Sequence, residues 1–290
     1  MANIFMRFPG GRFKALTLSY DDGPEADIQM IAIMKQHGLK GSFNLNSGIV
    51  PPEGTPSRLG KKRHRRLTYS ESLALYKDSG MEIAIHGLTH AYLNIAPDHQ
   101  CIFEIMQDRL NLEKDFGCMV RGMAHPYEDG THRVANLAKA CGIVYARTGK
   151  CKETFDLPKT EDWMHLFATS HHSNPRLMEL TRDFVEQTVR FSSLLFSLIG
   201  HSWEFGAQDN WHIIDEFAAF VGGRDDIWYA TTIEIYDYMN AFDQLIFSAD
   251  MCTVYNPTNT TIYFQNGENK DGANMYCIHP GETIRLEQLL

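Results

Sequence analysis

Apolar and polar positions follow two alternating patterns along roughly the first 245 residues, and each pattern predicts one kind of element. Residues 16–20 alternate, which predicts a strand. In residues 25–37 the apolar residues Ile28, Ile31 and Met34 fall three apart, which predicts a helix ending at Gly38. Further strands are expected at 41–48, 81–85, 119–124, 143–147, 164–169, 194–199 and 227–230. Helices are expected at 68–80, 100–116, 133–141, 176–191 and 209–221, and a last one runs to about residue 244.

Seven or eight strand–helix units in roughly 245 residues favour a (β/α) barrel over an open sheet. We therefore predict an α/β fold, a distorted (β/α) barrel of seven or eight strands, over residues 1–247. Beyond Phe247, β-rich segments are separated by turn pairs such as Asn266-Gly267. Residues 248–290 should form a small antiparallel β appendage packed on the barrel, since so short a segment buries little core alone.

The expected long helix at 100–116 carries an apolar set that we assign to its inner side. The set consists of Ile102, Ile105, Met106, Leu110 and Leu112.

The first strand ends in two adjacent carboxylates, Asp21 and Asp22, followed by the turn pair Gly23-Pro24. Neighbouring residues on an extended segment point to opposite sides. One carboxylate can then bind a metal ion, while the other acts on the molecule that the metal ion binds. An isolated Asp-Asp-Gly is more often a surface turn, so the interpretation depends on the other strand ends.

Two histidines four residues apart, His86 and His90, directly follow the expected strand 81–85. A helical turn would place both rings on one face, where they can share a metal. Active sites of such barrels gather at the carboxyl ends of the strands, where the two aspartates also fall. One carboxylate and two imidazoles with open positions form a catalytic type of metal site, which accepts zinc, cobalt, nickel or manganese.

Two further strand ends carry polar clusters: residues 124–130, Ala-His-Pro-Tyr-Glu-Asp-Gly, and residues 200–204, Gly-His-Ser-Trp-Glu. His201 follows an apolar strand and suits a proton donor at the same rim of the barrel, with a buried core histidine as the alternative.

Together these strings resemble the polysaccharide deacetylase family, of the NodB-homology or carbohydrate esterase 4 type. The family's TFDDG motif corresponds to residues 19–23, and its H-(S/T)-x-x-H motif to residues 86–90 with Gly87 at the Ser/Thr position. Its third motif, close to R-P-P-Y, corresponds to residues 124–127, and its leucine-rich strand ending in histidine to residues 194–201. Order and spacing agree over roughly residues 14–205.

The resemblance implies a role for each matched residue. Asp22, His86 and His90 would bind a divalent metal ion, zinc first among the possibilities. Asp21 would be the base that takes a proton from a metal-bound water, and His201 the acid that protonates the leaving amine. A backbone N–H near Tyr127 would stabilise the oxyanion.

The sequence lacks two residues that the family pattern would supply, an arginine in the third motif and an aspartate beside the acid histidine. The third-motif arginine is replaced by Ala124, and we expect Arg147 to substitute for it, with Arg121 as a weaker candidate and a surface ion pair as the alternative for Arg147. The aspartate partner of the acid histidine has no clear match, and Asp162 or Glu204 could take its place. The residues expected to bind substrate are Asn44, Asn46, Pro126, Asp162, Trp163, His171 and Glu204; edge-strand hydrogen bonding is the alternative for the two asparagines and an exposed loop position for His171.

The net charge of −9 argues against nucleic acid as the main partner. The basic run at residues 61–66 suits a solvated loop or, more specifically, an anion-binding lid. Six scattered cysteines indicate free thiols. No signal peptide and no membrane span are visible, so a cytoplasmic protein is the default expectation, and an extracellular one if the sequence was shortened. The oligomeric state stays open.

The leading functional prediction is a metal-dependent hydrolase of non-peptide amides that removes N-acetyl groups from an amino sugar or polysaccharide. One alternative keeps the site but acts on a small linear amide or cyclic imide. Another is a carbohydrate-binding pseudoenzyme that uses the β-rich tail; the presence of all five residues Asp21, Asp22, His86, His90 and His201 argues against it.

Overall fold

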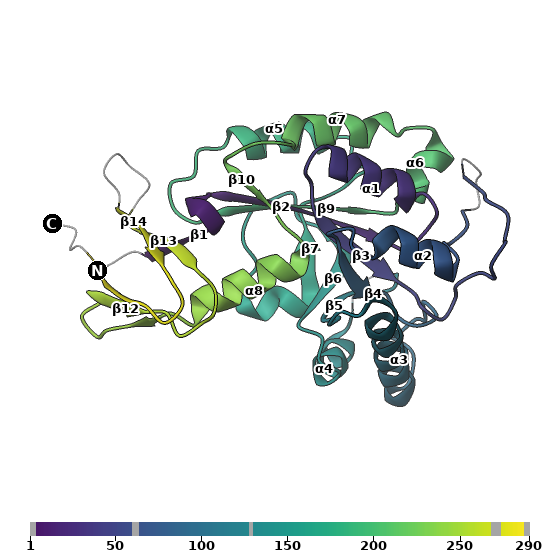
Figure 1. Cartoon of the computed structure of the whole chain (residues 1–290), viewed down its shortest axis with the longest axis horizontal. Coiled ribbons are helices and arrows are strands. Elements are labelled where there is room, and N and C mark those ends of the chain that lie inside the picture. The colour runs from purple at the N-terminus through teal and green to yellow at the C-terminus, as the bar shows by residue number, and fades with distance from the viewer. Residues whose placement is uncertain (1–3, 60–63, 128–129, 268–273, 287–290) are drawn as a thin grey trace.

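The computed structural model describes residues 4–59, 64–127, 130–267 and 274–286 of the chain. A large α/β body holds most of these residues, and a smaller group of antiparallel strands, drawn in yellow, lies beside it (Figure 1).

The body is built on a parallel sheet whose strands follow the order β7-β6-β5-β4-β3-β2-β9-β8. β7 and β8 are separated only by Thr169, yet β7 pairs with β6 and β8 pairs with β9, so the sheet closes on itself. β10 (Ile227–Tyr229) pairs with the first residues of β2. The predicted distorted (β/α) barrel is therefore confirmed. Its other strands are β2 (Lys14–Asp21), β3 (Gly41–Leu45), β4 (Glu82–Ile85), β5 (Gly122–Ala124), β6 (Tyr145–Cys151), β7 (Leu166–Ala168), β8 (Ser170–His171) and β9 (Leu194–Gly200).

Helices follow most strands and cover the outside of the barrel (Figure 1). A capping box formed by Thr68 and Glu71 begins α2. The helix predicted at 209–221 is wrong at its start: Asp209 has a left-handed conformation that ends α6, and α7 begins after it. The helices are α1 (Asp27–Gln36), α2 (Tyr69–Tyr76), α3 (Asp98–Phe116), α4 (His132–Ala140), α5 (Leu177–Glu186), α6 (Trp203–Gln208), α7 (His212–Val221), α8 (Thr232–Asp243) and the short 3-10 turns η1 (Pro9–Gly11) and η2 (Thr160–His165).

The predicted inner side of helix α3 is confirmed in part. Ile105 and Leu112 are buried in the core and Met106 packs against it, but Ile102 and Leu110 are 40% and 52% exposed. Glu104 and Asp108 are buried instead. The apolar pattern missed these two carboxylates because they have polar partners inside the protein, as described below.

The smaller group of strands forms two antiparallel sheets, as expected for the C-terminal segment. β13 (Ile262–Asn266) pairs with β14 (Asn274–Ile278), and β12 (Thr253–Tyr255) lies between β11 (Ile246–Phe247) and β15 (Thr283–Arg285). β1 (Ile4–Arg7), which the sequence did not predict, pairs with β13 and draws the start of the chain into this sheet. Val254 and Phe264 share one apolar core with Ala15 and Leu195, near the amino-terminal ends of β2 and β9.

Two bulk expectations also have structural counterparts. No disulfide joins any of the six cysteines, all of which lie in the described ranges. No helix in the described part of the chain combines the length and the apolar character needed to cross a membrane. The cellular compartment stays a prediction.

Asp27, at the start of α1, is a buried acid inside the barrel wall. Its carboxyl group accepts hydrogen bonds from the Tyr76 hydroxyl at 2.6 Å and the Ser202 hydroxyl at 2.5 Å. Burial outweighs these bonds and raises the pKa of Asp27 to about 7. The folded protein therefore holds a proton here that the unfolded chain releases above pH ~4.

We expect Asp27→Asn to flatten the fall in stability between pH 4 and 7. A group whose folded pKa is raised stabilises the fold at low pH, and this contribution is lost as pH rises through the folded pKa, by at most about 1.4 kcal/mol per pH unit. Urea unfolding at several pH values measures the slope. The exposed Asp215→Asn on α7 is the control and should leave the slope unchanged; equal slopes in wild type and Asp27→Asn would contradict the prediction.

Candidate active site

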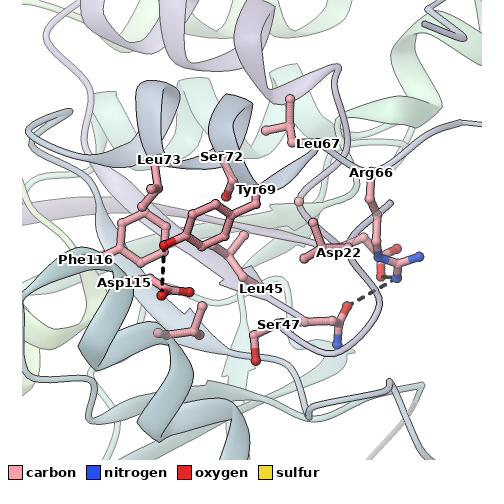
Figure 2. A pocket seen from close by; sticks show the side chains of 14 residues that line it. Asp22, Leu45, Ser47, Arg66, Leu67, Tyr69, Ser72, Leu73, Asp115 and Phe116 are labelled. Carbon is pink, nitrogen blue, oxygen red and sulfur yellow. Dashed lines mark hydrogen bonds and ion pairs between the residues drawn. The ribbon is translucent and has the colours of Figure 1, made fainter. Parts of the chain in front are cut away.

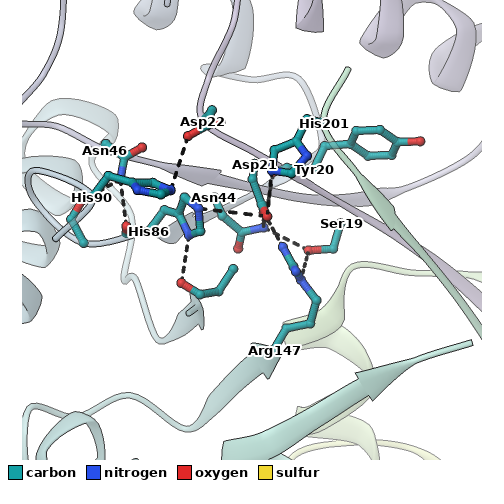
Figure 3. Close-up of polar contacts among 12 residues, drawn as sticks. Ser19, Tyr20, Asp21, Asp22, Asn44, Asn46, His86, His90, Arg147 and His201 are labelled. Atoms are coloured by element: carbon teal, nitrogen blue, oxygen red, sulfur yellow. Dashed lines mark hydrogen bonds and ion pairs between the residues drawn. The ribbon is translucent and has the colours of Figure 1, made fainter. Parts of the chain in front are cut away.

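The carboxyl end of β2 places two aspartates back to back. All eight residues of β2 are buried, and Asp22 and Gly23 then turn the chain through positive φ angles of 79° and 60°. The Asp21 side chain points toward Arg147 and His201, and that of Asp22 toward His90 (Figure 3). The opposite directions expected from the sequence are therefore present.

Asp22, His86 and His90 bring three donor atoms together within 4.8 Å of one another. The nearest Asp22 oxygen lies 3.7 Å from His90 Nε2. His86 uses Nδ1 on the backbone oxygen of Ala124, at 2.9 Å, which leaves Nε2 facing the site. One carboxylate and two imidazoles, one of them oriented by a backbone carbonyl, fit a divalent cation.

The loop that carries the two histidines is not the helical turn that the spacing suggested. Gly87 and His90 have positive φ angles of 76° and 57°. Two carboxylates of α3 hold the loop in this shape. Glu104 accepts hydrogen bonds from the backbone and the hydroxyl of Thr89, at 2.8 and 2.6 Å, and Asp108 accepts one from His86 N at 3.2 Å. Glu104 and Asp108 were missed at the sequence level; their i,i+4 spacing beside the buried Cys101 and Ile105 was the available signal.

Asp21 is held by a buried network. Its Oδ1 forms an ion pair with Arg147 and accepts a hydrogen bond from Asn44 Nδ2 at 2.8 Å. Burial alone would raise the pKa of Asp21, but Arg147, together with His86 and His201, holds it at about 2. Arg147 on β6 is the register partner of Ala124 on β5, so its guanidinium reaches the site from the strand next to the expected arginine position. Arg121 instead pairs with Asp237 at the surface.

His201 lies across from Asp21, with Nε2 3.9 Å from Asp21 Oδ2. Its Nδ1 is 2.9 Å from Glu204 Oε1. Burial alone would lower the pKa of His201, but the hydrogen bond to Glu204 and the charges of Asp21 and Asp22 raise it above its ordinary value. Of the two expected partners, Glu204 is the one beside the ring. Asp162 accepts a hydrogen bond from the backbone of Lys159 at the start of η2 instead.

Comparison with known proteins agrees with this geometry. Residues 9–146 match the family described as polysaccharide deacetylase. This stretch contains Asp21, Asp22, His86 and His90. Over this region, which is just under half of the chain, the sequence is similar to the polysaccharide deacetylase family. The resemblance read from the motifs is thereby confirmed, whereas no curated protein matches the sequence.

A solved structure with a TM-score above 0.5 supports the fold. A protein of Mycobacterium smegmatis, provisionally named a polysaccharide deacetylase, has 16% identity and a TM-score of 0.56, with 81% of this chain and 93% of that one covered. The Streptococcus pyogenes deacetylase PplD, solved with acetate, has 16% identity and a TM-score of 0.40; the match covers 46% of this chain and 55% of that one. A Bacillus anthracis protein described as a CE4 family pseudoenzyme has 14% identity and a TM-score of 0.45, with coverages of 79% and 67%.

The site formed by these residues opens into a cavity of about 360 Å³. Its lining includes Asp21, Asp22, His86, His90, Arg147 and His201, together with Tyr127 and His171. Tyr127 is 52% exposed; its ring stacks on that of Tyr92 at 4.1 Å and meets the edge of His90 at 4.5 Å. The cavity thus has an aromatic wall beside the cation-type donors.

Several residues predicted to bind substrate lie outside the cavity wall. The amide of Asn44 holds β2, and that of Asn46 donates to the backbone oxygens of His86 and Gly87, at 2.7 and 2.6 Å. Pro126 is buried next to Gly87. Trp163 is buried in the core shared with the appendage, 5.0 Å from the ring of Tyr236. These side chains shape the fold around the site, because their contacts are with the protein itself.

The last two residues of the basic run are not part of a solvated loop. Arg65 is buried between Glu25 and Glu71, and Arg66 donates to Asp22 at 2.5 Å and to Asn46 Oδ1 at 3.2 Å. Figure 2 shows Arg66 and Asp22 at the edge of a second, largely apolar pocket between α2 and α3. Lys61, Lys62 and Arg63 lie outside the described residues, so the anion-binding lid stays a prediction. Arg66 was missed as a partner of the metal-type carboxylate because its contact spans 44 residues of sequence.

Proposed function

We propose that this protein is a metal-dependent deacetylase that hydrolyses the N-acetyl group of an amino sugar within a glycan. One observation carries the proposal: a carboxylate pinned by a buried arginine, three cation-type donors and a histidine with a raised pKa all face one cavity. These are the groups that amide hydrolysis needs, namely a base, an electrophilic centre and an acid.

In this proposal Asp22, His86 and His90 hold a divalent cation, zinc first and cobalt, nickel or manganese as alternatives. When bound, such a cation acidifies water and polarises the acetamide carbonyl. Asp21, ionised at neutral pH, takes the proton of the attacking water. His201, whose raised pKa favours the charged form, donates a proton to the nitrogen as the carbon–nitrogen bond breaks. The products are acetate and a free amine.

The remaining side chains orient these groups. Arg147 and Asn44 fix Asp21, while Glu204 fixes the ring of His201 through Nδ1 so that Nε2 faces the cavity. The exposed rings of Tyr127 and Tyr92 offer an apolar face on which a sugar ring can stack. The described part of the β-rich appendage packs near the amino-terminal ends of the strands, whereas the cavity lies at their carboxyl ends, so the proposal assigns the described appendage residues no part in hydrolysis.

The proposal is tested by measuring bound metal and released acetate together. We expect wild type to release acetate from N-acetylglucosamine oligomers, to lose this activity on chelation and to regain it with zinc or cobalt. Asp22→Asn should weaken metal binding at least about tenfold.

Other results would separate the alternatives. Metal binding without acetate release would contradict deacetylation and direct the search to small linear amides and cyclic imides. Oligosaccharide binding without hydrolysis of any amide would indicate a pseudoenzyme. Acetate release that survives complete metal removal would contradict the metal-dependent mechanism.

A further inference from the structure

A second group of cation-type donors lies on the other side of His201. His171 ends β8, His201 follows β9 and Glu204 lies in the first turn of α6, and one donor atom of each lies within 4.8 Å of the others. His171 Nε2 is 4.0 Å from Glu204 Oε2, and His201 Nδ1 is 2.9 Å from Glu204 Oε1. Donors around one tetrahedral zinc ion lie about 3.4 Å apart at ordinary bond lengths. The observed separations bracket this value.

Each of two donors is held in place by a further contact, as metal ligands usually are. His171 Nδ1 lies 2.7 Å from the hydroxyl of Ser173 and accepts a hydrogen bond from the backbone N–H of Ser173 at 3.2 Å, and these contacts hold the ring with Nε2 beside Glu204. His172 Nε2 lies 3.0 Å from Glu204 Oε2. The ring of His172 is itself fixed, because it is 2% exposed and stacks on Tyr20 at 5.8 Å.

We propose that His171, His201 and Glu204 form a second divalent-cation site, weaker than the first, and that zinc bound there inhibits the enzyme. The site would have two imidazoles and one carboxylate, a donor set that zinc accepts. Zinc bound to His201 Nδ1 would replace the hydrogen bond to Glu204 that holds the ring with Nε2 facing the cavity, and Nε2 is the atom that must carry the proton for the leaving amine. The existence of this site does not depend on the proposed function, whereas the inhibition rests on it.

The experiment is a zinc titration in which binding is measured by calorimetry and acetate release is measured in parallel. Wild type should bind two zinc ions in separable steps, and acetate release should rise with the first and fall with the second. His171→Gln should lose the second step, or weaken it at least tenfold, and keep the first. Asp22→Asn should show the reverse. His99→Gln, an exposed histidine at the start of α3, is the matched control and should bind both ions as wild type does.

Two results would overturn the inference: a single binding step in wild type up to millimolar zinc, or a second step unchanged in His171→Gln. Glu204→Gln provides an independent variant should His171→Gln fold poorly, and it should also lose the second step. Inhibition is expressed relative to the maximum activity of each protein. Because calorimetry needs no turnover, an absence of acetate release would overturn the proposed function alone and leave the two binding steps to test the site.

Discussion

Asp21→Asn should reduce acetate release by about 10²–10⁴-fold while the protein keeps its bound metal. This range is the usual contribution of a positioned general base. The amide of asparagine has nearly the shape of the carboxylate but cannot accept a proton at neutral pH. Asp21 is 5% exposed and points away from the His90 side of the site, so the donors of Asp22, His86 and His90 remain in place. Metal content by elemental analysis and initial rates of acetate release measure the two effects.

Asp22→Asn is the matched comparison, because it makes the same chemical change one residue later. It should lose metal and activity together, whereas Asp21→Asn should lose activity alone. If Asp21→Asn loses the metal as well, Asp21 is a ligand and the division of labour between the two carboxylates is wrong. If it retains more than a tenth of the wild-type rate, another group is the base.

Much of the barrel could be predicted because each strand–helix unit is encoded locally. The apolar runs and their turn residues are short-range signals, and the polar strings at the strand ends converge once the barrel closes. For this reason Asp21, Asp22, His86, His90 and His201 could be placed near one cavity without coordinates. Closure itself depends on Thr169, which lets one segment pair with β6 before it and β9 after it. No local sequence pattern distinguishes two short strands, β7 and β8, from one continuous strand.

The side chains that orient the site were harder to predict, since their partners are distant in sequence. Glu104 and Asp108 look like solvent-facing helix residues until the loop at residues 86–90 is placed beside them. Asp162 was a reasonable partner for His201 by residue type, but it caps η2, and Glu204 is nearer because α6 begins just after β9. Which side chains on neighbouring strands touch one another depends on the register of the strands. That register is fixed only when the whole barrel is assembled, so it cannot be inferred from a short stretch of sequence.

Arg147 was predicted from its residue type and its place at a strand end, but its contact with Asp21 is explained only by the register of the strands. The motif resemblance places an arginine where Ala124 stands on β5, and Arg147 lies directly beside Ala124 on β6. The side chains of Arg147 and Asp21 are 5% and 7% exposed. A buried ion pair is a poor source of net stability, but removal of one partner leaves an unpaired charge in the interior.

Arg147→Met should therefore destabilise the metal-free protein by about 3–5 kcal/mol, the usual cost of breaking a buried pair. The loss of the guanidinium also removes the main charge that lowers the pKa of Asp21. The double variant Arg147→Met with Asp21→Asn should recover part of the lost stability, because neither charge is then left without its partner. Urea unfolding of the wild type, both single variants and the double variant gives the interaction free energy as a double-mutant cycle.

Arg121→Met is the control for this cycle. Arg121 also pairs with an aspartate, Asp237, but their side chains are 30% and 48% exposed. Water screens such a pair, so its loss should cost less than about 1 kcal/mol. If Arg147→Met costs no more than Arg121→Met, or if the double variant is as unstable as the sum of its single changes, Arg147 does not act through Asp21. A large difference between the two arginines, relieved by Asp21→Asn, would instead locate the function of the missing family arginine on β6.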